Sequence, residues 1–313
     1  MRYSQGNRKR GAMSHRTWPS EQNCAIAQAA GVVGDWWSLL IVRDVTRGYR
    51  RFDELVSELG IARKVLTDRL HHLLTHGVLE RQPYQQRPTR YEYRLTPRGQ
   101  ALLPVLVTLQ DWGEQWLLGD GRPSATTTPR SSDAKRVRAL VGTRVPVGLR
   151  LPSTSGDTLD PAESEAETTI LFTYPGTGSL SPLPDNWSDI PGAAGCTLEN
   201  RLFRDALPGF AEVGAAVRGV STQRPDEQRA FAAAERIPFP LLSDADCQLT
   251  AALRLPTFRA ADSVRLRRLI LVLNCDREVR AVRYPVTDIA SGVEWALTRA
   301  KTSGRTTPPR SRG

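Results

Sequence analysis

The sequence predicts two domains of different class: an α+β winged helix-turn-helix over residues 17–118, then an α/β thioredoxin-like domain over residues 136–300. Three observations support this division. Short helices precede an extended hairpin in the first part, and strands alternate with helices in the second. Residues 119–135 between them are rich in Gly, Pro, Ser, Thr and Arg without a period, which predicts a flexible linker. The basic tails, 1–16 and 301–313, are expected to be disordered.

Composition narrows the classes of partner. A formal net charge of +10 favours a polyanion such as DNA. The four cysteines, at positions 24, 196, 247 and 275, match neither a zinc pattern nor a secreted disulfide framework, and we expect no metal and no cofactor. There is no apolar run of membrane-spanning length and no apolar signal core near the N-terminus. We therefore expect a cytoplasmic protein without a membrane partner.

Apolar periodicity and glycine stops define the elements of the first domain. The first expected helix opens at Pro19 and runs through Cys24 to Ala30, and Gly31 and Gly34 close it. Further helices are expected over residues 36–47, 51–59 and 63–75, and a long helix starts at Thr96. Between the last two, residues 78–83 and 89–95 form two extended runs around a basic tip. This order of elements is that of a winged helix, whose second motif helix enters the major groove.

The helix over residues 63–75 is the expected recognition helix. Leu66, Leu70, Leu73 and Leu74 recur at helical spacing and should face inward, which leaves a basic side facing outward. The predicted DNA-contacting residues on this helix and on the hairpin are Arg63, Lys64, Thr67, Arg69, Arg87 and Arg90. The alternative is a solvated basic face, and the hairpin that completes the winged order favours DNA contact.

The long helix that begins at Thr96 predicts self-association. Its apolar side contains more large residues than a small domain needs to fill its own core: Leu102, Leu103, Leu106, Leu109, Trp112 and Trp116. A two-fold dimer would bury the excess. We therefore expect a homodimer.

The first domain resembles the HxlR family of transcriptional regulators over nearly its whole length. The matching residues are Cys24, Trp37, Arg51, Phe52, Glu54, Leu55, Gly60, Ile61, Lys64, Leu66, Thr67, Arg69, Leu70, Gly77, Val78, Arg81, Tyr84, Pro88, Tyr93, Leu95, Thr96, Gly99 and Trp112. The resemblance implies a homodimer joined through its first and last helices. Some members of that family use a cysteine at the place of Cys24 as an oxidant sensor, whereas the residue pattern alone also fits a small buried side chain.

The second domain alternates strands and helices and ends in a hairpin. The expected strands lie at 168–174, 215–221, 239–244, 268–273 and 278–282, and the expected helices at 197–213, 225–235, 244–253 and 288–301. A strand, a loop and then a helix place Cys196 at a helix N-terminus, where unpaired N–H groups favour the thiolate. The domain contains no histidine, so a guanidinium is the remaining candidate for activating this thiol.

The segment from about 136 to 300 resembles the peroxiredoxin family, specifically the bacterioferritin-comigratory type. The matching runs are Tyr174-Pro175, Gly195-Cys196-Thr197, Phe203-Arg204-Asp205, Gly219-Val220-Ser221, Phe239 to Asp244 and Leu255-Pro256-Thr257. The resemblance implies that Cys196 is the peroxide-reactive cysteine. It also implies that Arg268 activates the thiol and lowers its pKa, with Arg267 and Arg265 as rivals in register.

The sequence departs from that family's pattern in two ways. The places of its usual proline and threonine before the cysteine are taken by Asp189 and Ala193, unless Pro175 and Thr177 loop back to replace them. The place of a local resolving cysteine is taken by Arg201. Resolution would then fall to Cys247, Cys275, the partner subunit or a small thiol.

These patterns together predict a DNA-binding transcriptional regulator whose redoxin domain senses or reduces hydroperoxide. The expected partners are double-stranded DNA, a second copy of the chain, a hydroperoxide and a thiol reductant. One alternative is a thiol peroxidase that carries an accessory DNA-tethering domain. Another is a regulator whose redoxin domain has lost its chemistry.

Overall fold

The structure, a computed structural model, describes residues 23–162, 165–178, 180 and 183–303. The expected start of the first helix at Pro19 and the expected tail at 1–16 lie outside these residues. So does residue 304 onward of the expected C-terminal tail, whereas residues 301–303 end the last helix.

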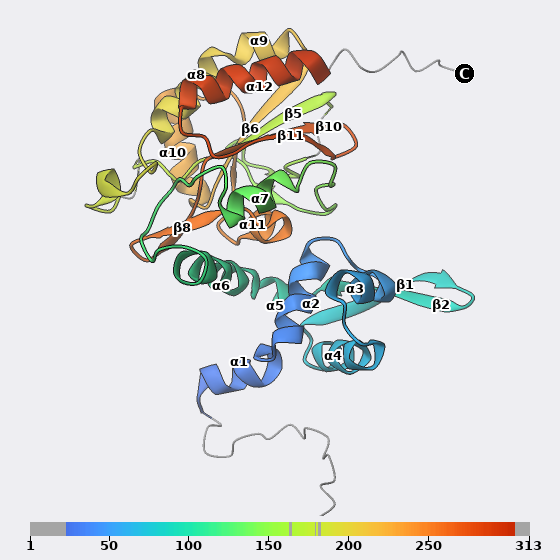
Figure 1. The fold of residues 1–313 in the computed structure, drawn as a ribbon. Coiled ribbons are helices and arrows are strands. Elements are labelled where there is room, and N and C mark those ends of the chain that lie inside the picture. The colour runs from blue at the N-terminus through green and yellow to red at the C-terminus, as the bar shows by residue number, and fades with distance from the viewer. Residues whose placement is uncertain (1–22, 163–164, 179, 181–182, 304–313) are drawn as a thin grey trace, which may run out of the picture.

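The first domain has the predicted winged order. Its elements are α1 (Ala25–Val33), α2 (Trp36–Thr46), α3 (Phe52–Leu59), α4 (Arg63–Thr75), β1 (Leu79–Gln86), β2 (Thr89–Leu95), α5 (Pro97–Gln100) and α6 (Leu103–Trp116). As expected, Leu66, Leu70 and Leu73 of α4 are buried, and they pack in one cluster with residues of α2 and α3. Strands β1 and β2 pair antiparallel, and the hairpin projects from the domain (Figure 1).

Two predicted helices are interrupted in the structure, and a proline accounts for each break. The long helix expected from Thr96 splits into α5 and α6, because Pro104 lacks the N–H that would bond to residue 100. The helix expected over 197–213 splits into α8 (Cys196–Asp205) and α9 (Leu207–Ala211), where Pro208 is the second residue of the new helix. Proline is tolerated in the first turn of a helix and disrupts its interior, so both helices restart just before the proline.

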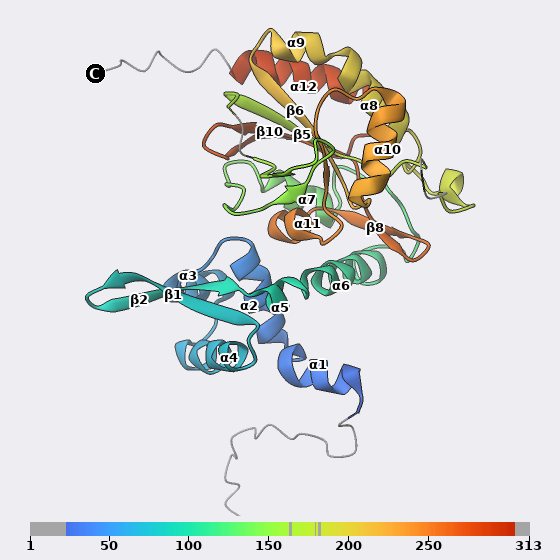
Figure 2. The same cartoon turned by 180° about the vertical axis from the view of Figure 1, so that it is seen from behind.

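The second domain is built on one mixed sheet with helices on both faces (Figure 2). The strand order is β11-β10-β5-β6-β7. Strands β5, β6 and β7 are parallel to one another, and β10 pairs antiparallel with both of its neighbours, β5 and β11. The strands of this sheet are β5 (Thr168–Thr173), β6 (Ala215–Ser221), β7 (Leu241–Ser243), β10 (Leu269–Asn274) and β11 (Val279–Arg283). The helices besides α8 and α9 are α7 (Ser132–Arg138), α10 (Pro225–Glu235), α11 (Gln248–Leu253) and α12 (Ile289–Ser303).

Alternation along the strands separates two cores. Ile170 and Phe172 of β5 join the cluster under α8, α9, α10 and α12, whereas Leu171 joins the cluster under α7 and α11. Two small hairpins were not predicted: β3 (Leu151–Pro152) with β4 (Thr158–Leu159), and β8 (Thr257–Ala260) with β9 (Ser263–Leu266).

The segment expected to be a linker is packed against the second domain. The Ala125 N–H donates to the Pro191 carbonyl at 2.9 Å, and Ala125 is buried in the core cluster of that domain. Helix α7 begins at Ser132, so residues 132–135 are helical, contrary to the expectation of a linker without helix. The composition that indicated a linker therefore belongs to an ordered connection.

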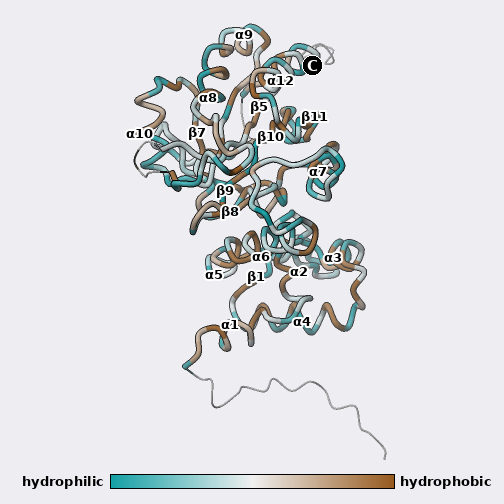
Figure 3. Tube along the Cα trace, turned by 60° about the vertical axis from the view of Figure 1, so that its left-hand side comes forward, coloured by the Kyte–Doolittle hydropathy of each residue, from teal (hydrophilic) through white to brown (hydrophobic). Residues whose placement is uncertain are grey.

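The two domains also meet directly, through α6. Leu103 and Val107 of α6 pack against Cys247 and Ala251 beside and within α11. At the same junction the Gln110 side-chain amide donates to the Leu255 carbonyl at 3.0 Å. Helices α1 and α4 lie on the side of the first domain that faces away from the second (Figure 3). Part of the apolar excess predicted on this helix is thus buried within one chain.

No single helix in the described part of the chain is long and apolar enough to cross a membrane. Only α1 and α2 taken together have that length and composition, and they are bent by 71° relative to each other.

Candidate thiol site and nucleic-acid interface

Cys196 is the first residue of α8 and lies beneath the surface. Only 4% of the residue is exposed. Gly195 before it has φ 103°, and a Cβ there would lie 2.7 Å from the Ile289 side chain of α12. Only glycine suits that conformation and that space. The helix start predicted for this cysteine is confirmed.

The buried Arg268 guanidinium approaches the sulfur directly. Its Nη2 lies 3.1 Å from Cys196 Sγ and 3.1 Å from the Ala193 carbonyl oxygen, and its Nη1 donates to the Gly192 carbonyl. Its Nε donates to a carboxylate oxygen of Glu199 at 2.9 Å. Four partners therefore fix one guanidinium, and the sulfur is one of them.

Neither rival arginine is hydrogen-bonded to the sulfur, although the charge of Arg265 does act on Cys196. Arg267, the preceding residue, forms an ion pair with Asp133 at 2.8 Å. Arg265 lies on β9, where its Nη1 is 2.9 Å from the position of a Cβ built on Gly176. Of the three candidates, Arg268 is the one placed against the sulfur.

Glu199 is a site residue that the sequence analysis missed. It is 1% exposed and lies three residues after Cys196 on α8, so both side chains share one helix face. Burial raises the pKa of Glu199 to about 7, and Arg268 opposes that rise. The spacing of three within a predicted helix was the signal available in the sequence.

The expectation of a depressed thiol pKa is reversed. The pKa of the Cys196 thiol is raised to about 11: burial is the main cause, Arg268 opposes the rise, and the Glu199 carboxylate adds to it. The sequence predicted that Arg268 would approach the thiol. It predicted neither the burial of the Cys196 sulfur nor the ion pair that Arg268 forms with Glu199. At neutral pH this arrangement favours the protonated thiol.

The run from Pro175 to Thr177 does return to the cysteine. The Gly176 N–H donates to Cys196 Sγ at 3.4 Å. The Thr177 hydroxyl is instead bonded to the Gln223 side chain, whose Oε1 also accepts from the Thr177 N–H at 2.8 Å. A backbone donor therefore stands beside the sulfur, and the threonine holds the loop in place.

The other three thiols lie in different surroundings, and all four cysteines are free. Cys24 precedes α1 and is partly exposed, and Cys275 is exposed in the turn between β10 and β11. Cys247, one of the candidate resolving thiols, is only 5% exposed and packs at the contact between the domains. Burial raises its pKa to about 12.

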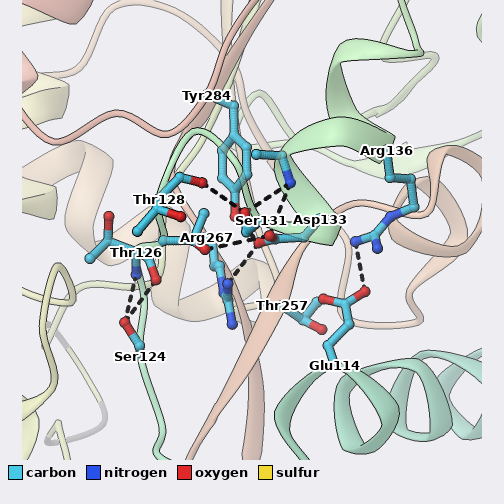
Figure 4. A network of polar contacts seen from close by, with 12 residues as sticks. Glu114, Ser124, Thr126, Thr128, Ser131, Asp133, Arg136, Thr257, Arg267 and Tyr284 are labelled. Atoms are coloured by element: carbon cyan, nitrogen blue, oxygen red, sulfur yellow. Dashed lines mark hydrogen bonds and ion pairs between the residues drawn. The ribbon is translucent and has the colours of Figure 1, made fainter. Parts of the chain in front are cut away.

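A polar network near α6 connects the domains (Figure 4). Asp133 accepts from Arg267 at 2.8 Å and from the Tyr284 hydroxyl at 2.5 Å. Glu114 of α6 forms an ion pair with Arg136 of α7 at 2.7 Å. The charge of Arg267 also acts on Glu114, whose pKa is raised by burial to about 7. Arg267, the residue next to Arg268, is thus electrostatically coupled to the DNA-binding domain.

The expected DNA-contacting residues divide into two groups. Arg63, Lys64 and Thr67 lie exposed on α4, and Arg63 is held over the Phe52 ring and paired with Asp53 at 2.9 Å. Arg87 and Arg90 are exposed on the hairpin. Arg69 is only partly exposed, and its Nε lies 3.4 Å from Asp35, so its side chain is directed to its own domain.

Metal ligands do not cluster in the described part of the chain: no three His, Cys, Asp or Glu side chains there lie close enough to hold a metal ion.

Family comparisons agree with both halves of this architecture. The model of the HxlR-like helix-turn-helix family matches residues 32–120, and the model of the AhpC/TSA family matches residues 190–282. The chain belongs to the HxlR-like helix-turn-helix family. It joins this DNA-binding domain to a peroxiredoxin-like domain with a thioredoxin-like fold.

Among proteins of known sequence, the chain is 42% identical over 93 residues to an uncharacterized HTH-type transcriptional regulator of Mycobacterium tuberculosis. The match covers 30% of this chain and 59% of that regulator. An HTH-type regulator of Synechocystis is 39% identical over 95 residues, which are 30% of this chain and 70% of the relative. YvaP of Bacillus subtilis is 33% identical over 99 residues, which are 31% of this chain and 92% of YvaP.

Solved structures resemble the second domain. Peroxidoxin BcpB from Mycobacterium tuberculosis is 27% identical with a TM-score of 0.43, covering 52% of this chain and 96% of that one. The Xanthomonas campestris bacterioferritin comigratory protein is 21% identical with a TM-score of 0.41, covering 50% of this chain and 92% of that one.

Proposed function

We propose that this protein is a DNA-binding transcriptional regulator whose peroxiredoxin-like domain responds to hydroperoxide through Cys196. The observation that carries the proposal is the contact of 3.1 Å between Arg268 Nη2 and Cys196 Sγ at the start of α8. A helix N-terminus and a guanidinium both stabilise negative charge on sulfur.

The proposed reaction begins with the thiolate. Its sulfur attacks one oxygen of the hydroperoxide, an S–O bond forms, and the O–O bond breaks. The cysteine is oxidised to sulfenic acid, and the peroxide is reduced to an alkoxide that takes up a proton and leaves as alcohol, or as water from hydrogen peroxide. Arg268 is positioned to stabilise charge on both the sulfur and the departing oxygen. A thiol reductant then restores Cys196 through a mixed disulfide.

We place the coupling between the two domains at Arg267 and Arg268. These two residues immediately precede β10 and have different partners: Arg268 contacts the Cys196 sulfur, and Arg267 pairs with Asp133 and acts electrostatically on Glu114 of α6. Oxidation of the sulfur changes what Arg268 can bind, and a shift of this strand end would move Arg267 as well. Helix α6 also belongs to the DNA-binding domain, so the network can transmit the change.

The DNA-binding proposal assigns α4 to the major groove, with Arg63, Lys64 and Thr67 meeting base edges and phosphates. The hairpin would place Arg87 and Arg90 near the flanking backbone. Arg69 contributes through its pair with Asp35, which orients the helix.

We also propose a homodimer, as the exposed aromatic residues suggest. Trp112 and Trp116 of α6 are 50% and 58% exposed, and Trp36 of α2 is 63% exposed. Sedimentation of the wild type at micromolar concentration should give twice the monomer mass, and Trp112→Ser should shift the protein towards monomer. A monomer in the wild type would contradict the dimer alone.

Peroxide consumption tests the chemical part of the proposal. The full chain is mixed with one equivalent of hydrogen peroxide, and the site of oxidation is read by mass spectrometry. We expect sulfenic acid or a mixed disulfide on Cys196, none in Cys196→Ser, and unchanged oxidation in Cys275→Ser. Excess peroxide with a thiol reductant then separates one-time sensing from turnover. Oxidation of Cys24 with Cys196 reduced would contradict the assignment.

A further inference from the structure

A pocket lies between the two domains, apart from the thiol site. Its walls come from α2 and α6 of the DNA-binding domain and from α11 with Arg254, which follows α11. The volume of the pocket is about 210 Å³. Cavities of roughly 150 Å³ in proteins hold benzene, so this one has room for a single ring or a short chain with a polar group.

The wall of the pocket is mostly apolar, and its polar residues include two arginines. Leu39, Leu40, Leu106 and Leu109 line it together with Arg43 and Arg254. Three leucines in this set are only partly buried and Leu109 is 50% exposed. A ligand that entered would remove this apolar surface from water, which favours binding.

The side chains around the pocket include more arginines than carboxylates that pair with them. Arg43 and Arg47 both pair with Asp44 at 2.8 Å, Arg47 also pairs with Glu58 at 2.7 Å, and Arg136 pairs with Glu114. The Arg254 guanidinium has no ion-pair partner among the residues that the structure describes. The pKa of Arg254 is lowered to about 10 by burial first and then by the charges of Arg136, Arg43 and Arg47, and Asp44 only partly opposes this. An anion beside Arg254 would relieve this repulsion.

Hydrogen bonding fixes the position of the Arg254 main chain, and this limits where its side chain can reach. The residue has φ 50°, and its carbonyl accepts from Arg136 Nε at 2.9 Å. Arg136 is in turn tied to α6 through Glu114. The Arg254 guanidinium and the apolar wall are therefore held in fixed relative positions by contacts between the two domains.

We propose that this pocket binds a small amphipathic anion, a carboxylate with an aromatic ring or a short alkyl chain. Its apolar part lies against Leu39, Leu40 and Leu106, and its carboxylate meets Arg254 and Arg43. Since both domains form the pocket, such a ligand stabilises their present arrangement. This site goes beyond the proposed peroxide response, and no residue lining it belongs to the Cys196 site.

The test measures binding of benzoate and octanoate to the full chain by calorimetry, with benzyl alcohol and 1-octanol as uncharged counterparts. We expect each acid to bind at least tenfold more tightly than its alcohol, because a charge-assisted hydrogen bond is lost with the carboxylate. Arg254→Gln should weaken the acids about tenfold and leave the alcohols unchanged. The matched control is Arg138→Gln, an exposed arginine on α7, which should bind like the wild type.

Two results would overturn the proposal. One is equal binding of acid and alcohol, or of wild type and Arg254→Gln. The other is binding of neither acid to the full chain. Cys196→Ser should bind benzoate like the wild type, so failure of the peroxide response leaves this test intact.

Discussion

Arginine has opposite environments in the two domains of this protein. On α4 and the hairpin, Arg63, Arg87 and Arg90 are exposed, where water screens their charge and a phosphate can reach them. In the second domain Arg268 is buried and committed to four partners, one of which is the Cys196 sulfur. The comparison teaches that an exposed guanidinium remains accessible to a partner such as a phosphate. A buried guanidinium acts only on the groups placed around it, and its effect on one of them depends on the charges of the others.

The largest effect that sharpens this comparison is the pH dependence of Cys196 oxidation. Because burial raises the thiol pKa to about 11, the thiolate is a minor form at neutral pH. At any pH below this pKa, the thiolate population should increase about tenfold for each unit by which the pH is raised. Stopped-flow measurement of sulfenic acid formation from pH 7 to 9 should show a rise of about 100-fold. A rate that is flat over this range would mean that the thiol is already ionised.

The next effect isolates the charge that Arg268 shares. Glu199→Gln removes a buried negative charge next to the thiol and keeps a side chain that can accept from Arg268. The thiol pKa should fall by about one unit, and oxidation at pH 8, above the Glu199 pKa of about 7, should become about tenfold faster. The pKa is read from thiolate absorbance, with Glu212→Gln, on the exposed surface, as control. An unchanged or higher thiol pKa would show that Glu199 does not oppose the thiolate.

The smallest effect concerns the exposed arginines. Arg63→Ala and Lys64→Ala should each weaken binding several-fold to a duplex selected by the reduced protein from random DNA. The salt slope should fall by about one for each lost phosphate contact. Arg138→Ala on α7 is the control and should bind normally. Unchanged affinity and slope in both α4 variants would mean that this helix does not enter the groove.

The sequence predicted those features that depend on local pattern. Leucine spacing placed the inward face of α4, and the strand-loop-cysteine order placed Cys196 at the start of α8. Among three arginines close in sequence, Arg268 was preferred by resemblance, and the structure places it against the sulfur.

Features that depend on tertiary packing were missed. The apolar surface of α6 was assigned to a dimer, although Leu103 and Val107 pack against the second domain of the same chain. No local pattern distinguishes these two partners for an apolar face. The sign of the thiol pKa shift was also wrong, because burial of the sulfur and the approach of Glu199 arise only when α8 packs against Arg268. The breaks at Pro104 and Pro208 were predictable from proline chemistry and were overlooked.

The central claim is that the redox state of Cys196 changes DNA binding. Its most direct test is the affinity of the full chain for its selected duplex, measured by fluorescence anisotropy before and after one equivalent of peroxide. The account predicts that peroxide changes the Kd of the wild type, that a thiol reductant restores it, and that Cys196→Ser binds the duplex with the same Kd in both conditions. A wild-type Kd that stays constant while mass spectrometry shows Cys196 fully oxidised would contradict it.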